Sequence, residues 1–201
     1  MPAYDAILFD FDGVLADSEA IHYACWTEVL SPMGINLTWE DYTANCIGIT
    51  DRAMLEVLRH RVDPPVDIDR LWPLYPVKKA LFRKKAATES PVAESTCELI
   101  RSLDLPIAVV SSSGRAELEP VLKNAGILDY FRTLVCFEDV TRVKPNPDPY
   151  LEAARRLNIS KPLVVEDSEA GIAAGRAAGF EVLQITHPGS LAQVLRDHLA
   201  G

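Results

Sequence analysis

Side chains that could take part in chemistry occur at four places in the sequence, each just past a predicted buried strand. They are Asp10-Phe11-Asp12-Gly13, Ser111-Ser112-Ser113-Gly114, Lys144 within a proline-rich segment, and Glu166-Asp167-Ser168. Open α/β sheets bind their ligands at the carboxyl ends of the strands. We therefore expect the four groups to meet at one edge of a sheet.

The first group carries two acids one residue apart, Asp10 and Asp12. In a strand, their side chains would point to the same face. Burying two carboxylates together is costly unless a cation joins them, and Gly13 would let the backbone leave the strand in a tight loop. For this group alone, an acidic turn without chemistry is the alternative.

Each of the other groups also has a simpler explanation when it is taken alone. The hydroxyls and amides from Ser111 to Gly114 suit a phosphate oxygen, although an ordinary polar turn is more common. Three prolines would stiffen the loop that carries Lys144, although a lysine in such a turn is usually solvated. Glu166 and Asp167 suit a hard cation, or they could cap the following helix.

Together, the acid pair, the hydroxyl, the lysine and the second acid pair indicate phosphoryl transfer. A carboxylate attacks phosphorus only if its own charge and the charge of the phosphate are both screened, as a magnesium ion and a lysine would do. A second acid nearby can protonate the leaving oxygen and then take a proton from water. The combination is far more specific than any of its parts.

Short apolar runs predict the strands that position these groups. They span Ala6–Phe11, Ile107–Val110, Thr133–Phe137, Leu163–Val165 and Val182–Ile185. Continuous apolar runs of this kind predict a parallel sheet that is covered on both faces. Helical patterns separate the later strands, so we expect an open α/β fold.

Several residues predict how those helices begin, pack and end. Asp148 and Pro149 are expected at N-cap and N1, Ser168 is expected to cap the next helix, and Gly179 to end it. The apolar residues expected to line the last helix are Leu191, Val194, Leu195 and Leu199.

The interval between Asp12 and Ile107 is too long for a simple crossover. It holds roughly 95 residues, whereas a parallel crossover needs about a dozen. Its pattern is helical, so we expect an α/β core at residues 1–14 and 90–201 and an inserted helical domain at residues 15–89. Four aromatic residues lie in this inserted domain, Trp26, Trp39, Trp72 and Tyr75, and we expect most of them to form its small core. We expect the basic residues from Lys78 to Lys85 on a solvated helix face.

Composition narrows the class of protein. The chain has 201 residues, of which 48% are hydrophobic, and a net charge of −9. These values predict a soluble protein that binds neither nucleic acid nor membranes. The four scattered cysteines are typical of reduced thiols in a cytoplasmic protein. A small anionic substrate is still compatible, because one metal ion or one lysine can reverse the local field.

The motifs resemble those of the haloacid dehalogenase superfamily of phosphohydrolases, in the branch of phosphoglycolate phosphatase and β-phosphoglucomutase. Asp10-Phe11-Asp12-Gly13-Val14-Leu15 resembles its first motif, Ser111 its second, Lys144-Pro145-Asn146-Pro147 its third and Glu166-Asp167 its fourth. The resemblance covers nearly the whole chain. It implies a Rossmann-like parallel sheet in the order 5-4-1-2-3 with an inserted α-helical cap.

The same resemblance implies roles for individual residues. Asp10 would be the nucleophile that forms an aspartyl-phosphate, and Asp12 the general acid and base. Mg2+ would be held by the Asp10 carboxylate, the Asp12 carbonyl oxygen and Asp167, with Glu166 helping directly or through water. The residues expected to hold the phosphoryl oxygens are Ser111, Ser112 and Lys144.

In the cap, the resemblance points to the turn from Gly48 to Arg52 as the part that reads the leaving group. Arg52 is therefore a candidate substrate ligand, although phosphoglucomutases of this branch have an arginine where Asp51 stands. His22 lies where many relatives carry a histidine, and we expect a packed side chain there.

These observations predict a Mg2+-dependent phosphatase that acts on a small phosphorylated metabolite, as a monomer or a weak homodimer. The alternative enzyme is a sugar phosphomutase that uses the same aspartyl-phosphate. Receiver-like signalling modules lack an acid of the Asp12 type and an insert of this size. True dehalogenases of the superfamily lack the second acid of the first motif.

Overall fold

The chain folds as two compact units in the computed structural model, which describes residues 4–47 and 49–201. The first unit is Met1–Asp17 with Ser90–Gly201, and the second is Ser18–Glu89. The predicted insert at residues 15–89 thus starts slightly earlier than the second unit. Leu15 and Ala16 belong to the first unit because their amides donate to the Phe11 carbonyl oxygen at 3.0 and 2.9 Å, closing a turn after the first strand.

The first unit is built on a parallel sheet, in which five strands of the described chain have the order β3-β2-β1-β4-β5. The strands are β1 (Ala6–Phe9), β2 (Ile107–Val110), β3 (Thr133–Val135), β4 (Pro162–Glu166) and β5 (Glu181–Gln184). This is the predicted order, 5-4-1-2-3, read from the opposite edge, and it confirms the predicted fold class. Strands β1, β2 and β4 are buried throughout, as strands covered on both faces must be.

Two strands are shorter than predicted, and one is less buried. β1 ends at Phe9 and β3 at Val135, each two residues before the predicted end. After β1 the chain enters the turn in which the Leu15 and Ala16 amides donate to the Phe11 carbonyl oxygen. β5 is an edge strand and stays partly exposed, so its apolar run does not mark burial on both faces.

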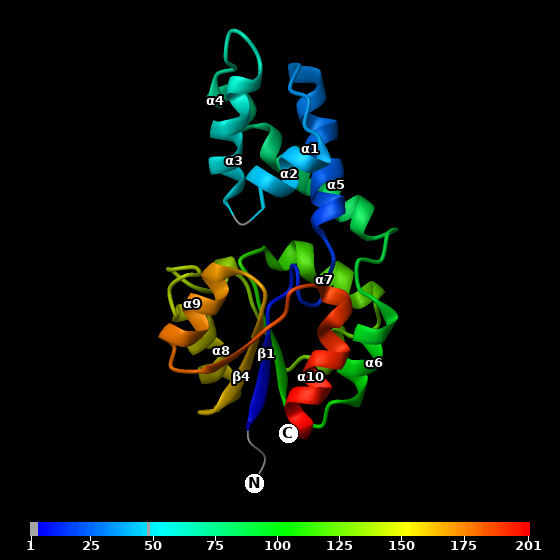
Figure 1. The fold of residues 1–201 in the computed structure, drawn as a ribbon, viewed down its shortest axis with the longest axis vertical. Helices are drawn as coiled ribbons and strands as arrows, with labels where there is room; N and C mark the ends of the chain where they lie inside the picture. Colours follow the sequence, from blue (N-terminus) through cyan, green and yellow to red (C-terminus); the bar gives the residue numbers. More distant parts are fainter. Residues whose placement is uncertain (1–3, 48) are drawn as a thin grey trace. The chain divides into compact units, whose positions relative to one another are not determined.

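Helices cover both faces of the sheet. Figure 1 shows α8 (Asp148–Leu157) and α9 (Glu169–Ala177) on one face, and α6 (Glu94–Ser102) and α10 (Leu191–Ala200) on the other. α7 (Arg115–Asn124) follows β2. The core beneath α8 and α9 consists of Leu8, Ala108, Val110, Val135, Tyr150, Ala153, Val164 and Ala174. Both layers hold the carboxyl ends of the strands in place.

The predicted helix ends are partly right. Ser168 Oγ accepts a hydrogen bond from the Gly171 amide at 3.1 Å, which confirms it as the cap of α9. The prediction for Asp148 is wrong, because Pro147 is the N-cap of α8 and the Asp148 carboxylate instead binds Arg142 at 2.7 and 2.8 Å. Leu199, predicted to line α10, is 38% exposed near the end of the chain.

The second unit is helical. Its helices are α1 (Glu19–Leu30), α2 (Trp39–Asn45), α3 (Asp51–Leu58), α4 (Ile68–Leu71) and α5 (Leu74–Ala86). Trp26 is 1% exposed in its core, and Trp72 and Tyr75 pack against that core, whereas Trp39 is 46% exposed. None of the helices in the described part of the chain has both the length and the apolar character needed to cross a membrane.

Candidate active site

The register of the sheet brings the two predicted acid groups to one place. Phe9 pairs with Val109 in β2 and with Val165 in β4, so the residues after these positions lie at the same level. Asp10 follows β1, and its amide donates to the Val165 carbonyl oxygen at 2.9 Å. Glu166 is the last residue of β4. The carboxyl ends of β1 and β4 therefore place two acids side by side.

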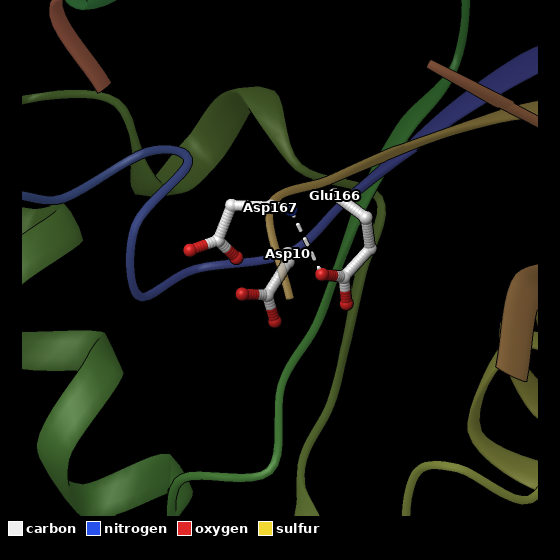
Figure 2. Close-up of side chains that lie close together, drawn as sticks. All are labelled: Asp10, Glu166 and Asp167. Carbon is white, nitrogen blue, oxygen red and sulfur yellow. Dashed lines mark hydrogen bonds between the residues drawn. The ribbon is translucent and has the colours of Figure 1, made fainter. Parts of the chain in front are cut away.

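Asp10, Glu166 and Asp167 form a cluster of carboxylates in the first unit. One oxygen from each lies within 4.8 Å of the others, and Figure 2 shows the three carboxylates turned to the same side. Glycines make room for them: a Cβ on Gly13, whose φ is +79°, would lie 2.0 Å from Asp167 Oδ2, and one on Gly171 would lie 1.6 Å from Glu166 Oε1. The backbone around the acids is thus closed to larger residues.

Lys144 joins the cluster from the segment between β3 and α8. Its ammonium group donates to Asp10 Oδ1 and Glu166 Oε1, both at 2.6 Å, and to the Val110 carbonyl oxygen at 2.8 Å. The Lys144 side chain is 5% exposed, and that of Glu166 is fully buried. The structure thus brings together Lys144 and both acid groups, as the sequence predicted.

Glu166 is held from both of its oxygens. Oε1 accepts hydrogen bonds from Lys144 and from the Tyr150 hydroxyl at 2.8 Å. Oε2 accepts from the Asp167 amide and from the amide and hydroxyl of Ser168, at 3.0 to 3.1 Å. Tyr150 is buried, and Lys144 Nζ lies 5.1 Å from its ring centroid. Because no sequence pattern singled out Tyr150, the prediction missed this contact.

Burial and mutual charge shift the pKa values of the cluster. Burial and the Glu166 charge raise the pKa of Asp10, partly offset by Lys144. Burial alone would raise the pKa of Glu166, but the charge and hydrogen bond of Lys144 bring it below the ordinary value. Burial and the charge of Glu166 raise the pKa of Asp167 to about 6. The site is therefore short of positive charge despite the lysine.

One carboxylate oxygen of the cluster, Asp167 Oδ1, is buried without a hydrogen-bond donor among the described residues. An unpaired buried carboxylate oxygen is costly, and three carboxylates in one place are the ligands that hard divalent cations prefer. The residues present therefore fit a metal such as Mg2+, which binds through oxygen.

Asp12 is attached to the loop that follows β2. The Ser113 hydroxyl donates to Asp12 Oδ2 at 2.8 Å, and the Ser113 amide donates to Ser111 Oγ at 2.9 Å. Ser111 is 3% exposed, whereas Ser112 is exposed. The sequence predicted phosphate contacts for Ser111 and Ser112 but no role for Ser113; the run of three serines was the only signal available for it.

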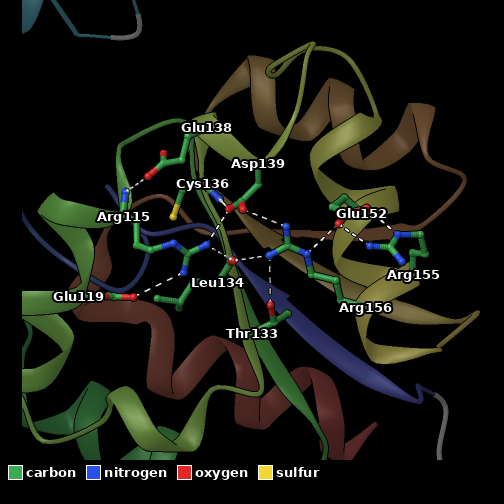
Figure 3. A network of polar contacts seen from close by, with 10 residues as sticks. All are labelled: Arg115, Glu119, Thr133, Leu134, Cys136, Glu138, Asp139, Glu152, Arg155 and Arg156. Atoms are coloured by element: carbon green, nitrogen blue, oxygen red, sulfur yellow. Dashed lines mark hydrogen bonds and ion pairs between the residues drawn. The ribbon is translucent and has the colours of Figure 1, made fainter.

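A network of charged residues fixes the start of the segment that carries Lys144. Asp139 precedes this segment and accepts from the Cys136 amide at 2.8 Å, from Arg115 of α7 at 2.7 Å and from Arg156 of α8 at 2.9 Å (Figure 3). Arg156 also binds Glu152 on its own helix at 2.7 Å. The network ties the start of this segment to α7 and α8.

The remaining predicted site residues lie in the helical unit. The Arg52 guanidinium is 5.2 Å from the Trp72 ring centroid, and Asp51 Oδ1 accepts from the Trp26 indole at 2.9 Å. Gly48 lies outside the described residues. His22 stacks on Phe82 with centroids 4.2 Å apart, the packed role predicted for it.

One prediction for the helical unit is wrong. Lys78 was expected on a solvated face but is 3% exposed. Its ammonium lies 5.3 Å from the Trp26 ring centroid and 3.6 Å from Asp51 Oδ1. Burial is tolerated here because the aromatic face and the carboxylate both stabilise the positive charge.

Relatives of known name match most of the chain. A phosphorylated carbohydrates phosphatase of Thermotoga maritima is 28% identical over 180 residues, which cover 88% of this chain and 82% of that protein. A fructose-1-phosphate phosphatase of Escherichia coli is 28% identical over 195 residues, covering 90% of this chain and 96% of that protein.

Solved structures and a family model agree with these relatives. A conserved haloacid dehalogenase-like protein from Agrobacterium tumefaciens is 28% identical, with a TM-score of 0.78 and coverage of 96% of this chain and 90% of that one. A predicted phosphoglycolate phosphatase from Haemophilus somnus has a TM-score of 0.87 over 98% and 99% of the two chains, and at 18% identity it shows the fold alone. The family model for haloacid dehalogenase-like hydrolases matches residues 7–185. The chain therefore belongs to the haloacid dehalogenase-like hydrolases, as its motifs predicted.

Proposed function

We propose that this hydrolase is a Mg2+-dependent phosphatase that acts on a small phosphate monoester, with phosphorylated sugars as the first class to test. The observation that carries the proposal is Lys144, which lies 2.6 Å from Asp10 and from Glu166 inside a buried carboxylate cluster. Two relatives named for phosphorylated carbohydrates and for fructose 1-phosphate support the choice of substrate class.

In the proposed reaction, Asp10 attacks the phosphorus atom. A bond forms between an Asp10 carboxylate oxygen and phosphorus while the bond from phosphorus to the leaving oxygen breaks. The leaving oxygen takes the electron pair and a proton from Asp12. Asp12 then takes a proton from water, which attacks the aspartyl-phosphate and releases phosphate and free Asp10.

Lys144, Ser111 and the Ser112 backbone are proposed to hold the phosphoryl oxygens during both steps. The Ser111 hydroxyl already accepts from the Ser113 amide, so its own proton can point to a phosphate oxygen. Lys144 would exchange one of its three present acceptors for the phosphoryl group. Arg52 is proposed to contact the remainder of the substrate from the helical unit.

The residues proposed to hold Mg2+ are Asp10, Asp167 and the carbonyl oxygen of Asp12. When bound there, the ion would screen the charges of the phosphate and the attacking carboxylate. Glu166 is proposed to act through water, because both of its oxygens already accept hydrogen bonds.

The test is phosphate release from a panel of sugar and other small phosphates, with Mg2+ and with excess chelator. We expect release to require Mg2+ and to vanish in Asp10→Asn, since an amide cannot be the nucleophile. Retained turnover in folded, metal-loaded Asp10→Asn would contradict the proposal. Conversion of one glucose phosphate to another with a bisphosphate activator, without phosphate release, would identify a phosphomutase instead.

The role of Asp12 has its own test. Asp12→Asn should lose about a hundredfold or more in kcat/KM with alkyl phosphates, whose leaving oxygen needs a proton, and much less with 4-nitrophenyl phosphate. The aspartyl-phosphate should accumulate with the activated ester, because no base then activates water. Equal losses on both esters without a trapped intermediate would remove Asp12 from this role.

A further inference from the structure

Ser113 makes two contacts, and the proposed reaction does not use the one made by its hydroxyl. Its hydroxyl donates to Asp12 Oδ2 at 2.8 Å, and its amide donates to Ser111 Oγ at 2.9 Å. Ser113 and Asp12 come from loops at the ends of β2 and β1, 101 positions apart in the sequence. One serine thus connects the proposed acid to the hydroxyl proposed to hold phosphate.

Asp12 lies beyond the strand that precedes it. β1 ends at Phe9, and Asp12 lies in the turn beyond it, next to Gly13 with its φ of +79°. The Asp12 side chain is only partly buried. The last torsion of an aspartate is broad and nearly two-fold, so its two oxygens exchange easily unless a hydrogen bond distinguishes them.

We propose that Ser113 is a positioning residue for Asp12, an inference that rests on the proposed function. The hydroxyl holds Oδ2 and thereby fixes the orientation of the carboxyl group that passes a proton to the leaving oxygen. In this role the hydroxyl acts only through Asp12. Removing the Ser113 hydroxyl should therefore slow turnover most for substrates whose leaving oxygen needs a proton.

The amide contact allows the hydroxyl to be tested separately. Ser113→Ala keeps the backbone N–H that donates to Ser111 Oγ and removes only the group that binds Asp12. Ser113→Thr and Ser113→Val form a second pair of similar shape, of which only the threonine carries a hydroxyl. Ser102→Ala is a matched control: Ser102 is an exposed serine of the same unit, and its hydroxyl donates to the Leu99 carbonyl oxygen of its own helix.

The experiment compares kcat/KM for an alkyl phosphate and for 4-nitrophenyl phosphate in these variants, with Mg2+ saturating. We expect Ser113→Ala and Ser113→Val to lose about tenfold on the alkyl ester, as for one hydrogen bond to a charged group, and less than twofold on the nitrophenyl ester. The loss should appear in kcat while KM stays unchanged. Ser113→Thr and Ser102→Ala should keep both activities.

Three results would overturn the inference. The first is an equal loss on both esters in Ser113→Ala, as a merely structural role predicts. The second is a threonine variant no better than the valine variant. The third is a Ser113→Ala effect that persists in an Asp12→Asn background.

Failure of the inference can be told from failure of the proposed function. If Asp12→Asn discriminates between the esters and Ser113→Ala does not, only the inference fails. If Asp12→Asn affects both esters alike, the acid role fails and the inference falls with it.

Discussion

Removing Lys144 should destabilise the fold and removing Asp10 should not, although both changes delete the same ion pair. The Lys144 side chain is 5% exposed and lies between Asp10 and Glu166, whose side chains are 10% and 0% exposed. Lys144→Met would leave two buried carboxylates without their cation. Breaking a buried ion pair in this way costs about 3–5 kcal/mol, so we expect a loss of that size in the free energy of unfolding.

Asp10→Asn leaves a buried lysine that still has partners, whereas Lys144→Met leaves buried carboxylates without their cation. Lys144 keeps Glu166 and the Val110 carbonyl oxygen as acceptors, so no buried charge loses all its partners. Burial and the charge of Glu166 raise the pKa of Asp10. An acid whose pKa is raised by folding destabilises the fold wherever it is ionised, from its unfolded pKa upward. Removing this charge should therefore leave stability unchanged or raise it.

Urea unfolding at pH 7.5 in excess chelator, followed by circular dichroism, measures both effects. Lys123→Met is the control for Lys144→Met, because Lys123 is exposed on α7 of the same unit. We expect the control and Asp10→Asn to unfold at or above the urea midpoint of the parent protein, and Lys144→Met well below it. A Lys144→Met variant within about 1 kcal/mol of the parent would refute the buried pair, and an equal loss in Asp10→Asn would refute the asymmetry.

Three further predictions follow from the site and its supports. Asp167→Ala should weaken Mg2+ binding far more than Glu166→Gln in calorimetric titrations with the metal alone; equal effects would mean that their roles are reversed. Asp139→Asn should lower the free energy of unfolding by about 1–3 kcal/mol at pH 7. Burial would raise the pKa of Asp139, but its hydrogen bonds and the two arginines hold that pKa below the ordinary value. The stability that the Asp139 carboxylate contributes is therefore present above the unfolded pKa near 4 and is lost as pH falls through the folded pKa. A difference in urea midpoint between variant and parent that stays the same at pH 3 would contradict this. Tyr150→Phe should cost about 1.5–3 kcal/mol, since it removes one donor from a buried carboxylate, and an unchanged midpoint would show that the hydroxyl does not hold Glu166.

The sheet and the cluster could be predicted because they depend on local patterns and on one rule of topology. Buried strands appear in the sequence as continuous apolar runs, such as Ile107–Val110, which is β2 in the structure. Polar residues that follow such strands must gather at one edge when the strands are parallel. Asp10 and Glu166 follow this rule at the ends of β1 and β4, and Lys144 reaches both at 2.6 Å from the segment between β3 and α8.

Contacts between side chains from distant elements could not be predicted in the same way. The Ser113 hydroxyl binds Asp12, and the Tyr150 hydroxyl binds Glu166. In the sequence, however, Ser113 is one serine of a polar run and Tyr150 lies on the apolar face of a helix, so neither contact is indicated. In the sequence, Lys78 is one of several basic residues on a predicted helix. In the structure it is buried next to the rings of Trp26 and Phe82, which the sequence pattern does not indicate. Such pairings depend on rotamers and on the approach of elements, which a pattern of residue types does not contain.

The acids at the end of β4 show how the backbone gives neighbouring carboxylates different roles. Glu166 is still part of the strand, and its buried side chain is surrounded by donors from α8, from the Lys144 segment and from the start of α9. Asp167 is the first residue beyond the strand and keeps a buried oxygen without a hydrogen-bond partner in the described chain. A carboxylate whose oxygens are both occupied can orient a lysine, whereas one with an unpartnered oxygen is suited to bind a cation. Because β4 ends between the two acids, Glu166 holds Lys144, whereas Asp167 is the residue that we propose to hold the metal.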